Sequence, residues 1–112
     1  MLTSGALFTA GELAHCHSRP DPHASLAGLF SAKEAFVKAI GSLGGAPDHT
    51  FPDIEVVHGP AGQPRIQLHG PIDRWRLQQD LAVELSISHT GDLAGAVVVL
   101  LTGPARSGGP TP

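Results

Sequence analysis

The densest group of chemically useful side chains lies between residues 33 and 38. Lys33, Glu34 and Lys38 fall within six positions, and the two lysines are the only ones in the 112-residue chain. Glu34 and Lys38 are spaced i,i+4 in the orientation that favours an ion pair on a helix surface, which contributes roughly 0.3 kcal/mol. On spacing alone we interpret them as a surface ion pair. Because the net charge is -3, an anionic ligand must be held locally, by such positive side chains, a metal ion or backbone amides.

A histidine and a histidine-cysteine cluster are the other groups whose types suggest chemistry. His89 ends an alternating apolar segment beside a glycine-containing turn, and a buried imidazole bonded to a backbone group is its plain structural interpretation. Residues 15–17 read His-Cys-His, which are zinc-ligand types. They lack the paired Cys-x-x-Cys or His-x-x-x-His spacing of a zinc site, so we do not expect a metal there.

Composition and charge bound the class of protein. A hydrophobic fraction of 41% in 112 residues suits one domain with one modest core. The longest apolar run, Ala94 to Leu101, is far shorter than the ~20 residues that cross a bilayer, and no leader pattern opens the chain. Cys16 is the only cysteine, which excludes an internal disulfide. We expect a soluble, cytoplasmic protein without general affinity for nucleic acid or membranes, since its net charge is -3.

Stretches rich in polar residues, proline and glycine mark the joints between elements. They cover residues 15–25, 41–52 and 59–64, and the same composition returns at residues 103–112. The last stretch has too little apolar surface to offset the entropy of ordering it. We therefore divide the chain into one domain, residues 1–102, and a disordered tail, residues 103–112.

One amphipathic helix carries the charged group. Leu26 to Ile40 has helical apolar periodicity, with Ser25 as a candidate N-cap and Gly41 as a stop. Lys33 falls near the middle of the apolar face, whereas the other two charges lie along its edge. A lysine in that position must either extend its ammonium past the core or meet an anion.

Two hairpins are predicted downstream. Residues 53–58 and 65–69 read as strands joined by a glycine- and proline-rich turn. Residues 83–88 alternate apolar and polar side chains, and an apolar strand at 93–101 follows a turn. His89 keeps the parity of the apolar positions before it, so it should point toward the covered face of its sheet.

A second, short helix separates the hairpins. Pro71 suits the first helical turn, and Ile72 and Trp75 would then share one side. The order helix, hairpin, helix, hairpin predicts an α+β domain in which helices pack on one face of an antiparallel sheet.

These segments together resemble the holo-acyl-carrier-protein synthases, the small class of 4'-phosphopantetheinyl transferases. The resemblance covers nearly everything from Leu7 to Leu101 and implies the 4'-phosphopantetheinyl transferase fold. Its motifs occur in the family's order: LFTAGEL at 7–13, LAGLFSAKEAFVKAIG at 26–41, DIEV at 53–56, GQP at 62–64, LSISHT at 85–90 and the apolar AGAVVV at 94–99.

The resemblance implies a reaction and a set of site residues. The reaction is transfer of 4'-phosphopantetheine from coenzyme A to a serine of an acyl or peptidyl carrier protein, with Mg²⁺ as cofactor and adenosine 3',5'-bisphosphate as product. Glu34 matches the family's magnesium-binding glutamate and Lys38 the lysine that contacts the pyrophosphate and is implicated in catalysis. His89 matches a strand-end histidine of the coenzyme A pocket, with a part in proton transfer. Further coenzyme contacts are expected at Gly62, Pro64, Ser86 and Ser88.

The same resemblance bears on assembly and on Lys33. Family members are homotrimers whose pockets are shared between neighbouring subunits, so we expect a homotrimer. Lys33 matches a lysine of the signature helix, but its place on the apolar face suits a structural or subunit-interface role at least as well. The motifs fit carrier proteins of fatty-acid, polyketide or peptide synthesis equally.

Departures from the family pattern are also visible. The family's opening Gly-Ile-Asp-x-Val strand, whose aspartate is a second magnesium ligand, and the arginine after it have no counterpart upstream of Leu7. Leu29 and Gln63 stand where an arginine and a lysine are usual. The strand is then encoded upstream of Met1, supplied by another polypeptide, or lost. In the last case the chain would be a non-catalytic carrier-protein-binding or assembly domain, the alternative function.

Overall fold

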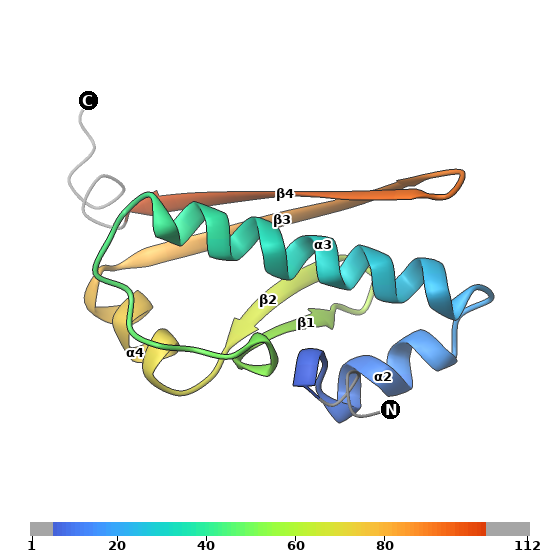
Figure 1. Cartoon of the computed structure of the whole chain (residues 1–112), viewed down its shortest axis with the longest axis horizontal. Helices are drawn as coiled ribbons and strands as arrows, with labels where there is room; N and C mark the ends of the chain where they lie inside the picture. The colour runs from blue at the N-terminus through green and yellow to red at the C-terminus, as the bar shows by residue number, and fades with distance from the viewer. Residues whose placement is uncertain (1–5, 103–112) are drawn as a thin grey trace.

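A long central helix, α3, organises the fold in the computed structural model, which describes residues 6–102 (Figure 1). It runs along the β3–β4 hairpin and also contacts β1, and α2 packs against it. The predicted tail, residues 103–112, lies outside the described residues. In chain order the elements are α2 (Ala10–His17), α3 (Pro22–Gly41), the 3-10 turn η1 (Phe51–Asp53), β1 (Ile54–His58), β2 (Pro64–Leu68), α4 (Pro71–Gln78), β3 (Leu81–Thr90) and β4 (Leu93–Thr102).

The central helix begins one turn earlier than its periodicity predicts. Asp21, not Ser25, is the N-cap: its carboxylate accepts a hydrogen bond of 3.1 Å from the amide of Ala24. Pro22 then occupies the first helical turn, where its missing N–H and fixed φ are favourable. The helix also includes Gly41 and ends at the C-cap Ser42. The Asp-Pro pair was the signal for this start, and it was hidden within a stretch interpreted as a joint.

The preceding helix is fixed by its own cap. Thr9 is the N-cap of α2; its hydroxyl accepts from the amide of Glu12, and the Glu12 carboxylate accepts from the amide of Thr9. This reciprocal capping box satisfies two amides that the helix leaves unpaired. Because α2 extends to His17 and α3 begins at Pro22, seven of the eleven residues in the predicted loop at 15–25 are helical.

Both predicted hairpins form, but they do not share a ladder. β1 pairs with β2 and β3 pairs with β4, each antiparallel, as two separate two-stranded sheets. β2 and β3 approach each other without backbone pairing between them. The expectation of one sheet is therefore wrong, whereas the α+β class, the antiparallel pairing and the order of elements from α3 onward are confirmed. The helix α2 was not predicted.

The interior is divided between two apolar clusters, one at each end of α3. The first joins α3 to α4 and both hairpins, and the predicted pair Ile72 and Trp75 is buried in it. The second joins α3 to α2 and β1. Their buried members are Phe36, Ile40, Ile54, Leu68, Ile72, Trp75 and Leu81 in the first, and Phe8, Cys16, Leu29, Ala32 and Val56 in the second.

Candidate active site

Three of the expected coenzyme contacts lie together in one cavity. Gly62 comes from the β1–β2 turn, Pro64 from the first position of β2 and His89 from the end of β3, and all three line a cavity of about 470 Å³. Gly62 has a φ of +87°, which lets the turn close on itself through a bond of 2.9 Å from its amide to the Gly59 carbonyl. A cavity of this size suits a small organic ligand.

His89 is oriented by the N-terminal end of α3. Its Nε2 lies 3.0 Å from the carbonyl oxygen of Ala24. Since a carbonyl only accepts, Nε2 carries the proton and donates, which leaves Nδ1 as the acceptor of the neutral ring. Gly28 provides the space, because a Cβ there would lie 2.8 Å from His89 Nε2. His89 thus faces the helix-covered side of its hairpin, as its parity predicts.

Three further residues of the cavity wall have basic side chains, which the sequence did not reveal. His15 and Arg19, from α2 and the segment after it, line the cavity together with His58 from β1. The rings of His15 and His58 are stacked, with centroids 3.8 Å apart and planes 12° from parallel. Burial, His15 and Arg19 together lower the pKa of His58. His15 had been weighed only as a zinc ligand, and its distance from His58 in the sequence hid the pair.

Glu34 and Lys38 lie in a different place, along an open groove on α3. Phe30, Ser31, Ala35 and, from β4, Ala96 complete the lining of this groove. Glu34 is half-buried and Lys38 is exposed. Within residues 6–102 neither side chain has a hydrogen-bond or ion-pair partner. The surface ion pair expected from their spacing is therefore not present.

The helix geometry separates this groove from the His89 cavity. Glu34 follows Gly28, which contacts His89, by six residues. Six residues correspond to about 9 Å along the axis and about 240° around it. The two groups of candidate site residues consequently face different sides of one chain, with no residue common to both linings.

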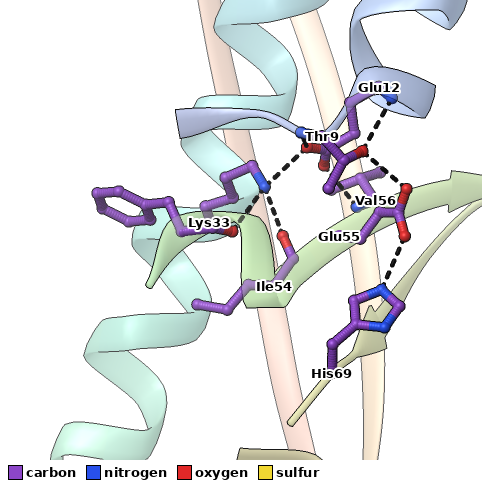
Figure 2. Close-up of polar contacts among 8 residues, drawn as sticks. Thr9, Glu12, Lys33, Ile54, Glu55, Val56 and His69 are labelled. Carbon is purple, nitrogen blue, oxygen red and sulfur yellow. Dashed lines mark hydrogen bonds and ion pairs between the residues drawn. The ribbon is translucent and has the colours of Figure 1, made fainter. Parts of the chain in front are cut away.

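Lys33 has a structural role. Its side chain is fully buried, its Nζ lies 2.9 Å from Glu12 Oε1, and it donates to the carbonyls of Phe51 and Ile54 (Figure 2). Glu12 also accepts from the amide of Val56 at 2.7 Å. Burial lowers the pKa of Lys33 and the Glu12 carboxylate partly offsets this. The lysine on the apolar face thus meets an anion, one of the two outcomes expected from the sequence.

A second polar chain continues from this ion pair. The Thr9 hydroxyl donates to Glu55 Oε2 at 2.8 Å, and His69 Nε2 lies 2.8 Å from Glu55 Oε1 (Figure 2). Burial raises the pKa of Glu55, but the bonds from Thr9 and His69 outweigh it and lower the pKa overall. These contacts tie the N-cap of α2 to β1 and to His69, the residue that follows β2.

Ser86 and Ser88 are not part of either site on this chain. They alternate with Ile87 and His89 along β3, and both are exposed on the side of the hairpin away from the cavity. Their expected contact with the coenzyme has no support from the cavity lining.

The donor set for a metal ion is small. Among the described residues no three His, Cys, Asp or Glu side chains gather closely enough to hold a cation. In the His-Cys-His run Cys16 is buried while His15 stacks on His58. Glu34 supplies one carboxylate that has no partner within residues 6–102, in an open groove, which fits Mg²⁺ only if a ligand's phosphate oxygens and waters complete its shell.

Residues 4–98 match the model of the 4'-phosphopantetheinyl transferase superfamily. The chain is 42% identical over 98 residues to a holo-[acyl-carrier-protein] synthase of Chlorobaculum parvum, covering 88% of this chain and 76% of that protein. The solved holo-[acyl-carrier-protein] synthase of Neisseria meningitidis is 31% identical with a TM-score of 0.79, over 91% of this chain and 82% of that one. An ACPS–CoA complex of Chronobacterium ammoniagenes is 33% identical with a TM-score of 0.77, over 89% of this chain and 81% of that one.

Within residues 6–102, no helix has the length and apolar composition that crossing a bilayer requires.

Proposed function

This chain belongs to the 4'-phosphopantetheinyl transferase superfamily, and we propose that it transfers 4'-phosphopantetheine from coenzyme A to a serine of an apo acyl or peptidyl carrier protein. The serine oxygen forms a bond to the phosphorus that carries pantetheine, and the bond from that phosphorus to the bridging pyrophosphate oxygen breaks. The products are the holo carrier protein and adenosine 3',5'-bisphosphate, and the serine proton is released. The proposal includes a cytoplasmic location.

The observation that carries this proposal is the basic cavity beside His89. Coenzyme A is an anion, and the cavity offers it the fixed positive charge of Arg19 together with the imidazole rings of His15, His58 and His89. Its relative from Chronobacterium ammoniagenes has been solved as a complex with CoA. Gly62 in the β1–β2 turn and Pro64 at the start of β2 line the same cavity.

Glu34 and Lys38 are proposed as the pyrophosphate end of the site. The Glu34 carboxylate would hold Mg²⁺ together with the substrate's phosphate oxygens, and Mg²⁺ would neutralise charge on those oxygens. Lys38 is exposed and has no partner among the described residues, so its ammonium is available to a pyrophosphate oxygen. A preorganised positive charge at the leaving group is the main contribution a protein makes to phosphoryl transfer.

His89 is proposed to take the proton from the attacking serine. With Nε2 committed to the Ala24 carbonyl at 3.0 Å, Nδ1 is the nitrogen that would accept it. The Ala24 carbonyl would then stabilise the imidazolium that forms, because it holds the Nε2–H bond throughout.

A homotrimer is part of the proposal because one chain separates the two groups of residues. His89 lines the cavity and Glu34 the groove, on different sides of α3. A second copy that brings its groove to the first copy's cavity would complete a site. The outer face of β4 offers an apolar surface for such contact, made of Leu93, Val97, Val99 and Leu101.

The direct test is incubation of the purified chain with apo carrier protein, coenzyme A and Mg²⁺, followed by intact-protein mass spectrometry. We expect the carrier protein to gain the mass of one phosphopantetheine arm, and to gain none when coenzyme A is omitted. A folded chain that binds carrier protein without modifying it would instead support the carrier-protein-binding alternative.

Glu34→Ala should abolish the transfer and leave the fold intact, because the side chain has no partner within residues 6–102. Asp48→Ala, which removes an exposed loop carboxylate, is the matched control and should keep full activity. Initial rates and urea midpoints measured on both variants check this. Full activity of Glu34→Ala would remove Glu34 from the metal site.

A further inference from the structure

One side chain of the β1–β2 turn packs on the turn itself instead of lining the cavity. Gln63 is not among the residues of the cavity wall, although its neighbours Gly62 and Pro64 both are. The Gln63 side chain lies against the backbone of Gly59: a Cβ added to Gly59 would be 2.7 Å from both Cδ and Nε2 of Gln63 and 3.0 Å from its Oε1. The glutamine therefore contacts the opposite end of the turn that carries it.

The Gln63 side chain also completes the hydrogen bonding of this turn. Its Oε1 accepts a bond of 3.0 Å from the amide of Ala61, which is another residue of the cavity wall. The backbone adds two bonds: the Gly59 amide donates to the Gln63 carbonyl at 2.8 Å, and the Gly62 amide donates to the Gly59 carbonyl at 2.9 Å. Of these three bonds, only the one from Ala61 depends on the type of a side chain.

The arrangement requires an acceptor at position 63. Gln63 stands where a lysine is usual in the family that the sequence resembles. A lysine has three N–H donors and no acceptor, so it could not receive the Ala61 amide. The neutral glutamine thus adds no charge for an anionic ligand, and its contacts are with the turn.

We propose that Gln63 is a positioning residue for coenzyme binding, because it orders the turn that carries Ala61 and Gly62 before the ligand arrives. The inference rests on the proposed function for the identity of the ligand. A segment that is ordered in advance loses less conformational freedom on binding, which raises affinity without a new contact to the ligand. Gln63 lines neither the cavity nor the groove of Glu34 and Lys38, so it acts on binding and not on the chemical step.

Hydrogen exchange of the Ala61 amide tests the order of the turn without any ligand. Gln63→Ala should speed this exchange about fivefold, because it removes one hydrogen bond. Gln63→Glu keeps an acceptor oxygen and should keep the slow exchange. Gln67→Ala, which truncates an exposed side chain of β2 outside the cavity wall, is the matched control and should leave Ala61 unchanged. Exchange at Ala61 that is unaffected by Gln63→Ala would overturn the positioning role.

Steady-state kinetics test the consequence for the site. Gln63→Ala should raise the KM for coenzyme A about fivefold and leave kcat unchanged, because the turn contributes equally in the ground state and the transition state. Gly59→Ala should have the same effect, since its Cβ displaces the Gln63 side chain and the φ of Gly59 lies outside the left-handed region. A lowered kcat with an unchanged KM would overturn the inference.

A double-mutant cycle shows whether the two substitutions act through the same contact. If Gly59→Ala acts by displacing Gln63, it should raise the KM no further in a chain that already carries Gln63→Ala. Fully additive effects of the two substitutions would contradict the contact as the cause.

Calorimetric binding of coenzyme A separates this inference from the proposed function. Weaker binding by Gln63→Ala than by the wild-type chain, without modification of any carrier protein, would refute the proposed function and support the role of Gln63. Transfer by a wild-type chain whose coenzyme affinity equals that of Gln63→Ala would refute the role of Gln63 alone. A wild-type chain that does not bind coenzyme A would refute both.

Discussion

At the scale of single residues, the two lysines of α3 have different roles: Lys33 stabilises the fold, and Lys38 is proposed to bind the substrate. Lys33 is fully buried, with Glu12 at 2.9 Å and two backbone carbonyls as acceptors. Lys38 is exposed beside the open groove. Five positions on one helix thus separate a residue that holds α2 to α3 and β1 from one that is free to meet a ligand.

This difference predicts opposite effects for the same substitution. Lys33→Met leaves the buried Glu12 carboxylate without its counter-charge, so it should destabilise the fold by about 3 kcal/mol. Lys38→Met should change the free energy of unfolding by less than about 0.5 kcal/mol, because it is a surface change, yet it should abolish transfer. Urea unfolding followed by initial-rate assays checks both. Equal stability losses in the two variants would contradict the assignment.

Side-chain contacts could be predicted from the sequence only where the two residues lie close together in it. The helical periodicity placed Lys33 on the apolar face. Its ammonium group therefore had to meet an anion or extend past the core to solvent. It could not name Glu12, because that contact depends on how α2 packs against α3. The His15–His58 stack was missed for the same reason, since it joins a helix to a strand that comes much later.

At the scale of elements, the start of α3 is fitted to the end of β3. Gly28 permits the close approach: an added Cβ would meet His89 Nε2 at 2.8 Å and Ile87 Cγ2 at 3.1 Å. The helix therefore sets where the histidine ring lies, through the space at Gly28 and the carbonyl of Ala24.

Gly28→Ala should consequently reduce kcat, because the imidazole must move away from the Ala24 carbonyl. Gly41→Ala, at the other end of the same helix and with nothing within 4 Å of its added Cβ, is the matched control. It should keep kcat and gain about 0.5–1 kcal/mol in stability from helix propensity. Steady-state kinetics and thermal unfolding of both variants test this. An unchanged kcat in Gly28→Ala would show that the ring position does not matter.

Most of the helices and strands could be predicted from the sequence, but the start of α3 and the arrangement of the two hairpins could not. Alternation in residues 83–88 and the apolar run at 93–101 predicted the β3–β4 hairpin, which forms with Leu81–Thr90 and Leu93–Thr102 in register. The helix start was misplaced because Asp21 and Pro22 lay in a polar stretch, where a cap and a loop use the same residue types. Whether two hairpins share one ladder is decided by α4 between them and by tertiary packing, neither of which periodicity reports.

At the scale of the whole molecule, the candidate site is divided between two sides of one chain. The cavity holds His89, Gly62 and Pro64, and the groove holds Glu34 and Lys38. Gly28 and Glu34, which mark the two linings, lie about 120° apart around the axis of α3 and about 9 Å apart along it. Catalysis by the proposed mechanism therefore requires a second copy, and a closed ring of copies would repeat the same heterologous contact at each interface.

Complementation between inactive variants tests this sharing directly. Glu34→Gln and His89→Ala should each be inactive alone, but co-expressed and purified together through two tags they should recover activity. A site forms wherever a subunit with intact Glu34 meets a neighbour with intact His89, which for random assembly from equal amounts gives about a quarter of the wild-type sites. Glu34→Gln co-expressed with Lys38→Met is the matched control: both residues lie in the same groove, so every site keeps a defect and no activity should return. Recovery in the first pair and not in the second requires sites completed across subunits, whereas equal inactivity of both pairs, in confirmed mixed oligomers, would mean that each chain builds its site alone.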